Sequence, residues 1–160
     1  MCLATACDVR VASARARLGF TFSRLGLHPG MGSTHFLPQL VGPEHAARLL
    51  LTGDTITGLE AKEIGLVSEV VQVEDDQDSI EATVARATEI AQRMASAAPI
   101  AVRSAVRSLR MRQEDGLEKA LWREADAQSY SYASTDLSDG IEAVAQKKNP
   151  NFQNFETYTE

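Results

Sequence analysis

Two different spacings of apolar residues divide this sequence. In the first half, Val9–Ala12 and Arg17–Phe22 alternate as strands do, and Ser68–Val73 is a β-branched run typical of a third strand. From Ile80 to Met94 the apolar residues instead recur every three or four positions, as on one stripe of a helix. The pattern therefore predicts an α/β segment first and an all-helical segment last.

Capping residues place short helices within the first half. Ser33 and Thr34 are natural N-terminal caps. Thr57 and Glu60 have the spacing of a capping box, and Gly65 is suited to end the helix that follows. The helices predicted here are the end of a buried helix at Cys2–Cys7, then Ser33–Leu40, Pro43–Leu51 and Ala61–Ile64.

The second half continues with helices separated by proline and glycine. An acidic turn at Glu74–Asp78 precedes the first of them. Its negative charges are favourable there because the N-terminus of a helix is the positive end of the helix dipole. The next helices are predicted at Ile100–Leu109, Leu117–Ala133 and Asp136–Lys148. The first of these three carries a basic face of Arg103, Arg107, Arg110 and Arg112, and the second an apolar side of Leu117, Leu121 and Trp122.

Composition narrows the class of protein. The 160 residues are 44% hydrophobic and 24% charged, as in a globular domain, and no apolar run reaches the length of a membrane span. The net charge of −6 argues against a general nucleic-acid binder. The cysteines Cys2 and Cys7 do not have the spacing of a zinc site, so we expect no metal and two small side chains in a reducing compartment. The start of the chain does not read as a signal peptide.

Several motifs in one order resemble the crotonase (enoyl-CoA hydratase/isomerase) superfamily. They are Cys7–Ser13 (CDVRVAS), Leu25–Thr34 (LGLHPGMGST), Leu40–Pro43 (LVGP), Leu51–Asp54 (LTGD) and Glu60–Val71 (EAKEIGLVSEVV). Each motif alone is weak, but their order and spacing together are specific. The resemblance covers this chain and corresponds to the C-terminal three-fifths of a family member.

This resemblance implies an α/β, crotonase-like fold. Residues 1–76 would form the C-terminal part of the ββα spiral, and residues 77–160 a helical trimerisation region. It implies a homotrimer or hexamer with an acyl-CoA ligand, in the cytoplasm or the mitochondrial matrix, with neither membrane nor nucleic acid as partner. Coenzyme A would enter as part of the substrate thioester, so no separate cofactor is expected.

The family polarises the thioester carbonyl with two backbone N–H groups and adds an acid or base beside them. Both oxyanion donors would lie before Met1, so we expect no crotonase-type turnover from this chain alone. The two positions that carry glutamates in the hydratases correspond here to Cys2 and Phe22. Phe22 would form an apolar wall. Cys2 would act either as a thiol base or nucleophile or, as we favour, fill space beside an acyl chain.

The loop of the second motif carries the remaining catalytic and acyl-binding candidates. His28 would lie near the reacting acyl group, either as a general base or, more simply, as a hydrogen-bonding loop residue. Leu25, Gly26, Pro29 and Gly30 would line the same place. Some relatives have an aspartate where this chain has Gly30, so that source of a carboxylate is absent as well.

Charged residues give a few further predictions. Arg24 would either bind a carboxylated acyl group or hold its loop together, and the second reading is preferred. Asp8 is expected either in a buried turn or in an ion pair, with Arg10 or Arg24 as its partner. Lys147 and Lys148 match a basic ending that approaches coenzyme A phosphates in the family, although a helix C-terminus attracts cations in any case.

Three functions stay open at this point. The first is enoyl-CoA hydratase- or isomerase-like chemistry on an acyl-CoA, with ordinary hydration unsupported by the residues present. The second is a non-catalytic acyl-CoA-binding or trimer-forming relative. The third is an inactive truncated product, whose uncovered strand edges would favour aggregation. The acyl group, the reaction type and the size of the oligomer cannot be derived from the sequence.

Overall fold

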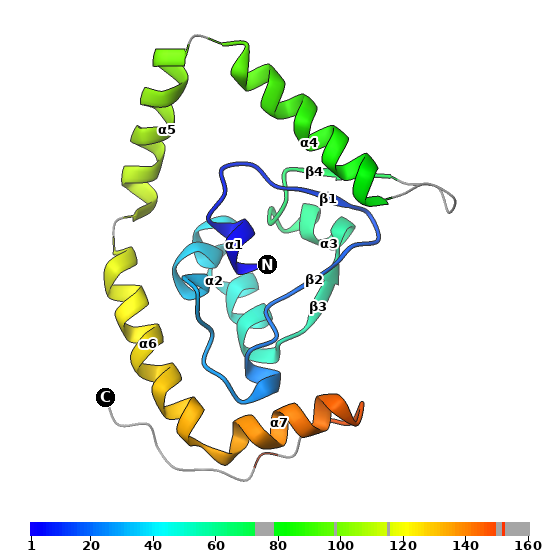
Figure 1. Ribbon diagram of the computed structural model, residues 1–160, viewed down its shortest axis with the longest axis vertical. Coiled ribbons are helices and arrows are strands. Elements are labelled where there is room, and N and C mark those ends of the chain that lie inside the picture. The colour runs from blue at the N-terminus through cyan, green and yellow to red at the C-terminus, as the bar shows by residue number, and fades with distance from the viewer. Residues whose placement is uncertain (73–78, 98, 115, 150–151, 153–160) are drawn as a thin grey trace.

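An α/β part is followed by four long helices in the computed structural model, which describes residues 1–72, 79–97, 99–114, 116–149 and 152 (Figure 1). The division predicted from the hydrophobic pattern is thus present. The predicted acidic turn at 74–78 and the proposed boundary between residues 76 and 77 lie outside the described residues.

Within the described residues, four short strands pair in two separate two-stranded sheets. They are β1 (Val11–Ser13), β2 (Arg17–Gly19), β3 (Thr55–Thr57) and β4 (Glu69–Val71). β1 pairs with β4 in parallel, with Ala12 opposite Val70, and β2 pairs with β3 antiparallel, with Leu18 opposite Ile56. The strand β3 had no counterpart among the sequence predictions.

The second predicted strand is shorter than expected. It ends at Gly19, and the chain then turns at Phe22, whose carbonyl accepts hydrogen bonds from the N–H groups of Leu25 and Leu27. These bonds form the 3-10 turn η1 (Ser23–Leu25). The prediction of Arg17–Phe22 as one strand was therefore wrong at its C-terminal end, because the local turn bonds replace a strand ladder.

The helices of the first half are α1 (Cys2–Thr5), α2 (Ser33–Thr52) and α3 (Gly58–Glu63). α2 contains the two predicted helices, joined at Gly42, whose φ of 78° and ψ of 163° break the helix before Pro43. The predicted capping box at α3 is confirmed, since Thr57 Oγ1 accepts from the Glu60 N–H and the Glu60 carboxylate accepts from the Thr57 N–H.

One apolar core holds these elements together. Its fully buried side chains come from the segment before η1, from both parts of α2 and from the turn after α3. The largest are Phe20, Leu37, Leu49 and Leu66. Ile56 and Ala61 complete the contact between β3 and α3. Such burial of large apolar side chains is the main stabilising term for a domain of this size.

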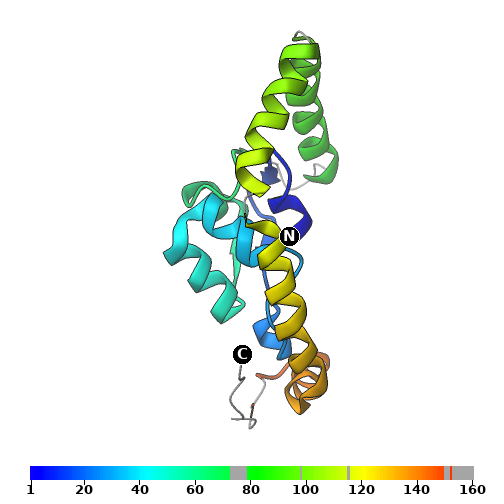
Figure 2. The same ribbon diagram turned by 90° about the vertical axis from the view of Figure 1, so that its left-hand side faces the viewer.

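The C-terminal helices form an arc around the α/β part (Figure 1). They are α4 (Ser79–Ala95), α5 (Pro99–Glu114), α6 (Leu117–Ala133) and α7 (Thr135–Ala145). α4 lies along β1 and β4, α6 contacts α2, and α7 contacts η1. Figure 2 shows that α4 and α5 extend beyond the α/β part at one end of the molecule.

Much of the apolar surface of these helices faces outward in the single chain. No described side chain of α4 is buried, and Ile80 and Val84 of its predicted stripe are exposed. Of the apolar side predicted for α6, Leu117 is half-buried and Trp122 is 71% exposed, while the buried positions of the helix are Ala120 and Glu124. The Glu124 carboxylate faces the start of α2 because the first N–H groups of that helix have no partner within it.

Ion pairs attach two of the outer helices. Arg86 of α4 pairs with Glu69 of β4 at 2.7 Å, and Arg110 of α5 pairs with Asp8 at 2.8 Å. The hydrogen bond from Arg110 holds the pKa of Asp8 below its usual value. Asp8 is therefore ion-paired as expected, but it is exposed and its partner is Arg110, since Arg10 donates to backbone carbonyls and Arg24 pairs with Asp54. No helix among the described residues is long and apolar enough to cross a membrane.

Candidate functional site

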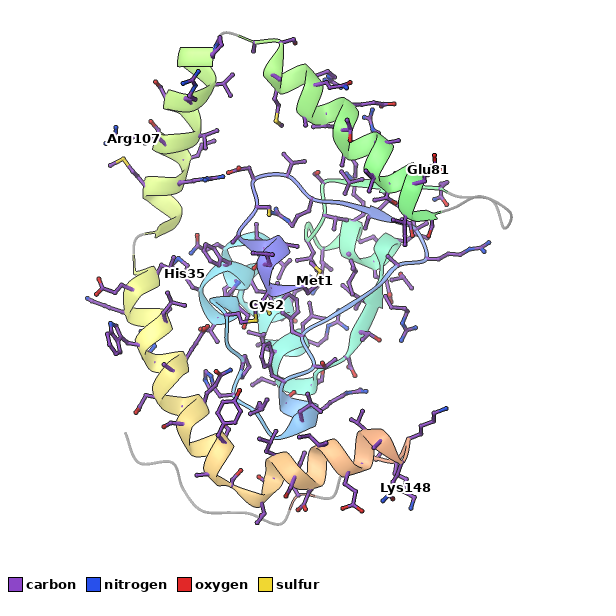
Figure 3. All side chains as sticks on the ribbon, viewed as in Figure 1. Met1, Cys2, His35, Glu81, Arg107 and Lys148 are labelled. Atoms are coloured by element: carbon purple, nitrogen blue, oxygen red, sulfur yellow. The ribbon has the colours of Figure 1, made fainter. Side chains whose placement is uncertain are left out.

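Cys2 begins the short helix α1 and lies in the apolar core. Its side chain is 7% exposed, and its carbonyl accepts a 2.7 Å hydrogen bond from Thr5 Oγ1. Burial raises the pKa of the Cys2 thiol, and the nearby charge of Glu124 adds to the rise. The thiol is thus held protonated at neutral pH, the less nucleophilic form. Figure 3 shows Cys2 beside Met1 in the middle of the α/β part.

Phe22 lies at the start of η1, partly buried against the same core as Cys2. The two positions that the family resemblance assigned to glutamates therefore share one apolar environment. Neither side chain is a carboxylate. Their surroundings are suited to contact with an apolar group and not to holding a charged base.

The loop after η1 is shaped by close contact with α7. Gly26 has a φ of 71°, and a Cβ there would lie 2.5 Å from the carbonyl carbon of Asp136. From the other side, a Cβ on Gly140 would lie 2.7 Å from the carbonyl carbon of Leu25. These two glycines let the backbones of loop and helix approach each other, so α7 fixes the beginning of the candidate loop.

His28 is tied to α6 through its backbone. Its N–H donates to Ser131 Oγ at 3.1 Å, and its carbonyl accepts from Gln128 Nε2 at 3.0 Å. The ring atom Nδ1 is buried and has no hydrogen-bond partner among the described residues. Such an atom is available to a ligand or to water, since buried polar atoms are usually paired.

Gly30 follows Pro29 and is buried under the side chain of Gln128. A Cβ at position 30 would lie only 2.2 Å from Gln128 Nε2. The place that a side chain at position 30 would occupy is therefore already filled from α6. The absence of a carboxylate at Gly30 is thus accompanied by a neutral carboxamide in the same space.

Glu124 of α6 binds the beginning of α2. Its carboxylate accepts from the Gly32 N–H at 2.7 Å, from the Thr34 N–H at 3.0 Å and from Thr34 Oγ1 at 2.6 Å. The helix has no cap from its own side chains, although Ser33 and Thr34 were predicted to supply one. The residue before the helix, Gly32, has no side chain, so a carboxylate from another helix takes the capping role.

The charged candidates lie away from this loop or are engaged locally. Arg24 donates to Asp54 Oδ1 at 2.6 Å and to the Thr52 carbonyl at 3.2 Å, which corresponds to holding its loop together. Lys147 and Lys148 are exposed at the end of α7, and their N–H groups close that helix. Figure 3 shows Lys148 at the far end of α7 from Cys2.

Three residues of α6 were missed by the sequence reading: Glu124, Gln128 and Ser131. Their spacing of four and then three residues places them on one helix face, and this was the available signal. Only the apolar residues of α6 were considered: Leu117 and Leu121 lie on the same face as Glu124, whereas Trp122 lies on the opposite, exposed side. In the described part of the chain, no group of three or more histidine, cysteine or acidic residues could hold a metal ion.

Comparisons with known proteins agree with this arrangement. A family model described as enoyl-CoA hydratase/isomerase matches residues 1–155. A crotonyl-CoA hydratase from Syntrophomonas wolfei is 37% identical over 150 residues, covering 94% of this chain and 55% of that protein. A 2,3-dehydroadipyl-CoA hydratase from Escherichia coli is 36% identical over 151 residues, covering 94% of this chain and 56% of that protein.

A solved structure of an enoyl-CoA hydratase has the same fold over most of this chain. The crystal structure of an enoyl-CoA hydratase from Mycobacterium avium subsp. paratuberculosis matches with a TM-score of 0.85 at 28% identity, covering 96% of this chain and 59% of that chain. The chain thus spans little more than half the length of the relatives it matches. The predicted partial crotonase-like fold is confirmed. This chain belongs to the enoyl-CoA hydratase/isomerase family.

Proposed function

We propose that this chain forms part of an acyl-CoA-binding site and that hydration by a pair of glutamates is not its reaction. The first half of the proposal is supported by the family and by the printed names of relatives, which are hydratases of crotonyl-CoA and 2,3-dehydroadipyl-CoA. The second half rests on the residues themselves.

The observation that carries the proposal is the apolar setting of Cys2 and Phe22. Water addition to an enoyl thioester needs a base that positions water and an acid that protonates carbon. A thiol whose pKa is raised by burial is protonated at neutral pH, and a phenyl ring carries no exchangeable proton. Both positions are suited to lining the path of an acyl chain.

The ligand would meet loop residues Leu25 to Gly30. His28 is the residue there with a buried and unpartnered ring nitrogen, so it is the group we assign to polar contact with the acyl end. Pro29 and Gly30 would supply apolar and backbone surface. Arg24 is engaged with Asp54, so we assign it to the loop. Lys147 and Lys148 stay candidates for coenzyme A phosphates, through their exposed ammonium groups.

A second candidate function is assembly without turnover, and the exposed apolar faces favour it. Ile80 and Val84 of α4, Trp122 of α6, and Ile141 and Val144 of α7 are each more than 50% exposed in the single chain. Contact with further copies would cover such surface. We therefore propose a homotrimer or hexamer, in the cytoplasm or mitochondrial matrix. Light scattering should give three or six times the chain mass of 17.4 kDa, and a monomer would contradict this.

Calorimetric titration tests the binding proposal. Butyryl-CoA is a suitable probe because it is saturated and cannot be hydrated. We expect saturable heat with butyryl-CoA and weaker binding of free coenzyme A, since the apolar setting of Cys2 and Phe22 favours the acyl group. No heat with butyryl-CoA, or equal affinity for the two ligands, would overturn the assignment of the acyl site.

A further inference from the structure

One face of α6 holds the segment from His28 to Thr34 through three residues spaced four and three positions apart. Glu124 accepts from the N–H groups of Gly32 and Thr34, Gln128 donates to the carbonyl of His28, and Ser131 accepts from the N–H of His28. Each of these α6 residues lies one helical turn from the next, so a single face of the helix makes all the contacts.

The segment needs such support because its backbone is unfavourable. Met31 has a φ of 58° and Gly32 a φ of 73°, so two successive residues adopt the left-handed region. A residue with a side chain seldom adopts that region unless its surroundings impose it. The Met31 side chain is 68% exposed, so its packing does not supply the restraint. The Glu124 bond to the Gly32 N–H acts directly on this turn.

Glu124 is not suited to act as a replacement acid or base. The residue is 3% exposed, and its two carboxylate oxygens accept three hydrogen bonds from Gly32 and Thr34. Removing the negative charge would leave these donors facing a weaker acceptor. Its chemistry is therefore that of a fixed anion at a helix N-terminus, which stabilises one backbone arrangement.

We propose that Glu124, Gln128 and Ser131 form a positioning face, which holds the 28–34 segment in its strained conformation and so places His28 and Gly30 for the acyl-CoA ligand. The inference rests on the proposed function for the identity of the ligand. It assigns these three residues as positioning residues, because they act through the backbone of the segment and touch no reacting atom.

Hydrogen exchange of single amides, measured on the whole chain, tests the positioning. Glu124→Gln keeps the size of the side chain but removes the charge, and Ser131→Ala removes one acceptor. We expect at least tenfold faster exchange at the Gly32 and Thr34 amides in Glu124→Gln, and at the His28 amide in Ser131→Ala. Glu118→Gln, an exposed residue of the same helix, is the matched control and should leave all three rates unchanged.

Butyryl-CoA binding by the same variants gives the readout that a merely structural role would not move. We expect about tenfold weaker affinity in Glu124→Gln and a smaller loss in Ser131→Ala, in which the melting temperature should fall only slightly because one hydrogen bond of His28 is lost. Unchanged exchange at His28 in Ser131→Ala would overturn the positioning face. Faster exchange with unchanged affinity would overturn its link to the ligand. No binding by the unmodified chain would instead count against the proposed function, and the exchange rates alone would then decide the positioning.

Discussion

The side chain of Gln128 occupies the space that a Cβ at Gly30 would need. Substitutions at the two positions should therefore have strongly coupled effects on the free energy of unfolding. The Gly30 backbone lies outside the left-handed region, so alanine fits its conformation. Its Cβ, however, would lie 2.2 Å from Nε2, 2.9 Å from Cδ and 3.2 Å from Oε1 of Gln128. In Gly30→Ala the carboxamide must therefore move away and release the His28 carbonyl.

The loss of stability in Gly30→Ala follows from that movement of the Gln128 carboxamide. Loss of the 3.0 Å hydrogen bond to the His28 carbonyl costs about 1 kcal/mol, and an off-rotamer glutamine adds roughly 0.5–1 kcal/mol. Gly30→Ala alone should thus destabilise by about 1–2 kcal/mol, and Gln128→Ala alone by about 1 kcal/mol. In the Gln128→Ala background the new methyl group enters vacated space, so Gly30→Ala should then cost close to zero.

Urea unfolding of the four proteins in this double-mutant cycle measures the coupling. We expect the double variant to be more stable than the sum of the single changes by about 1–2 kcal/mol. Gly58→Ala combined with Gln128→Ala is a suitable control, because Gly58 contacts Ser13 on β1 and should be independent of Gln128. If the effects of Gly30→Ala and Gln128→Ala on the free energy of unfolding add to within about 0.3 kcal/mol, the claim that the two side chains compete for the same space is refuted.

Three other substitutions or probes test the packing of the α/β part. Gly58→Ala should lower stability by about 2–3 kcal/mol, because its Cβ would lie 2.0 Å from the carbonyl oxygen of Ser13; an unchanged thermal melt would contradict that contact. A thiol reagent should modify exposed Cys7 rapidly and Cys2 only after unfolding, since burial raises the Cys2 pKa; two fast thiols in the native protein would argue against this. Thr57→Ala should cost about 1 kcal/mol in urea unfolding by removing the α3 cap, and no change would contradict the capping box.

Local signals in the sequence were sufficient for several elements of the fold. The Thr57 and Glu60 spacing predicted α3, and Gly65, with its φ of 80°, follows that helix as expected. Pro43 correctly indicated a new helical segment after the break at Gly42. These features depend on neighbouring residues in the chain, so periodicity and capping rules capture them.

Features that depend on distant residues could not be derived in the same way. The cap of α2 comes from Glu124, some 90 residues later, because Gly32 has no side chain to offer. Asp8 pairs with Arg110 across a separation of 102 residues. The face that α6 buries contains a carboxylate, which the usual search for apolar stripes excludes.

The candidate site also combines features that local sequence signals predict with features that depend on distant residues. The loop from Leu25 to Gly30 was identified from its motif, whereas its fixation by Gln128 became visible only when α6 was placed beside it. Cys2 lies in the core, while its predicted role of filling space beside an acyl chain stays a prediction. The buried and unpartnered Nδ1 of His28 required the three-dimensional arrangement.

We propose that this chain binds an acyl-CoA without hydrating it. The measurement that tests this most directly is to mix the purified chain with crotonyl-CoA, at a concentration that saturates binding, and to follow the absorbance of the enoyl thioester. We expect crotonyl-CoA to bind without loss of that absorbance above the uncatalysed rate, because Cys2 and Phe22 supply neither base nor acid. Steady hydration of crotonyl-CoA by the unmodified chain would contradict this prediction, and the Cys2→Ala and Phe22→Leu variants would then show whether either position supplies the chemistry.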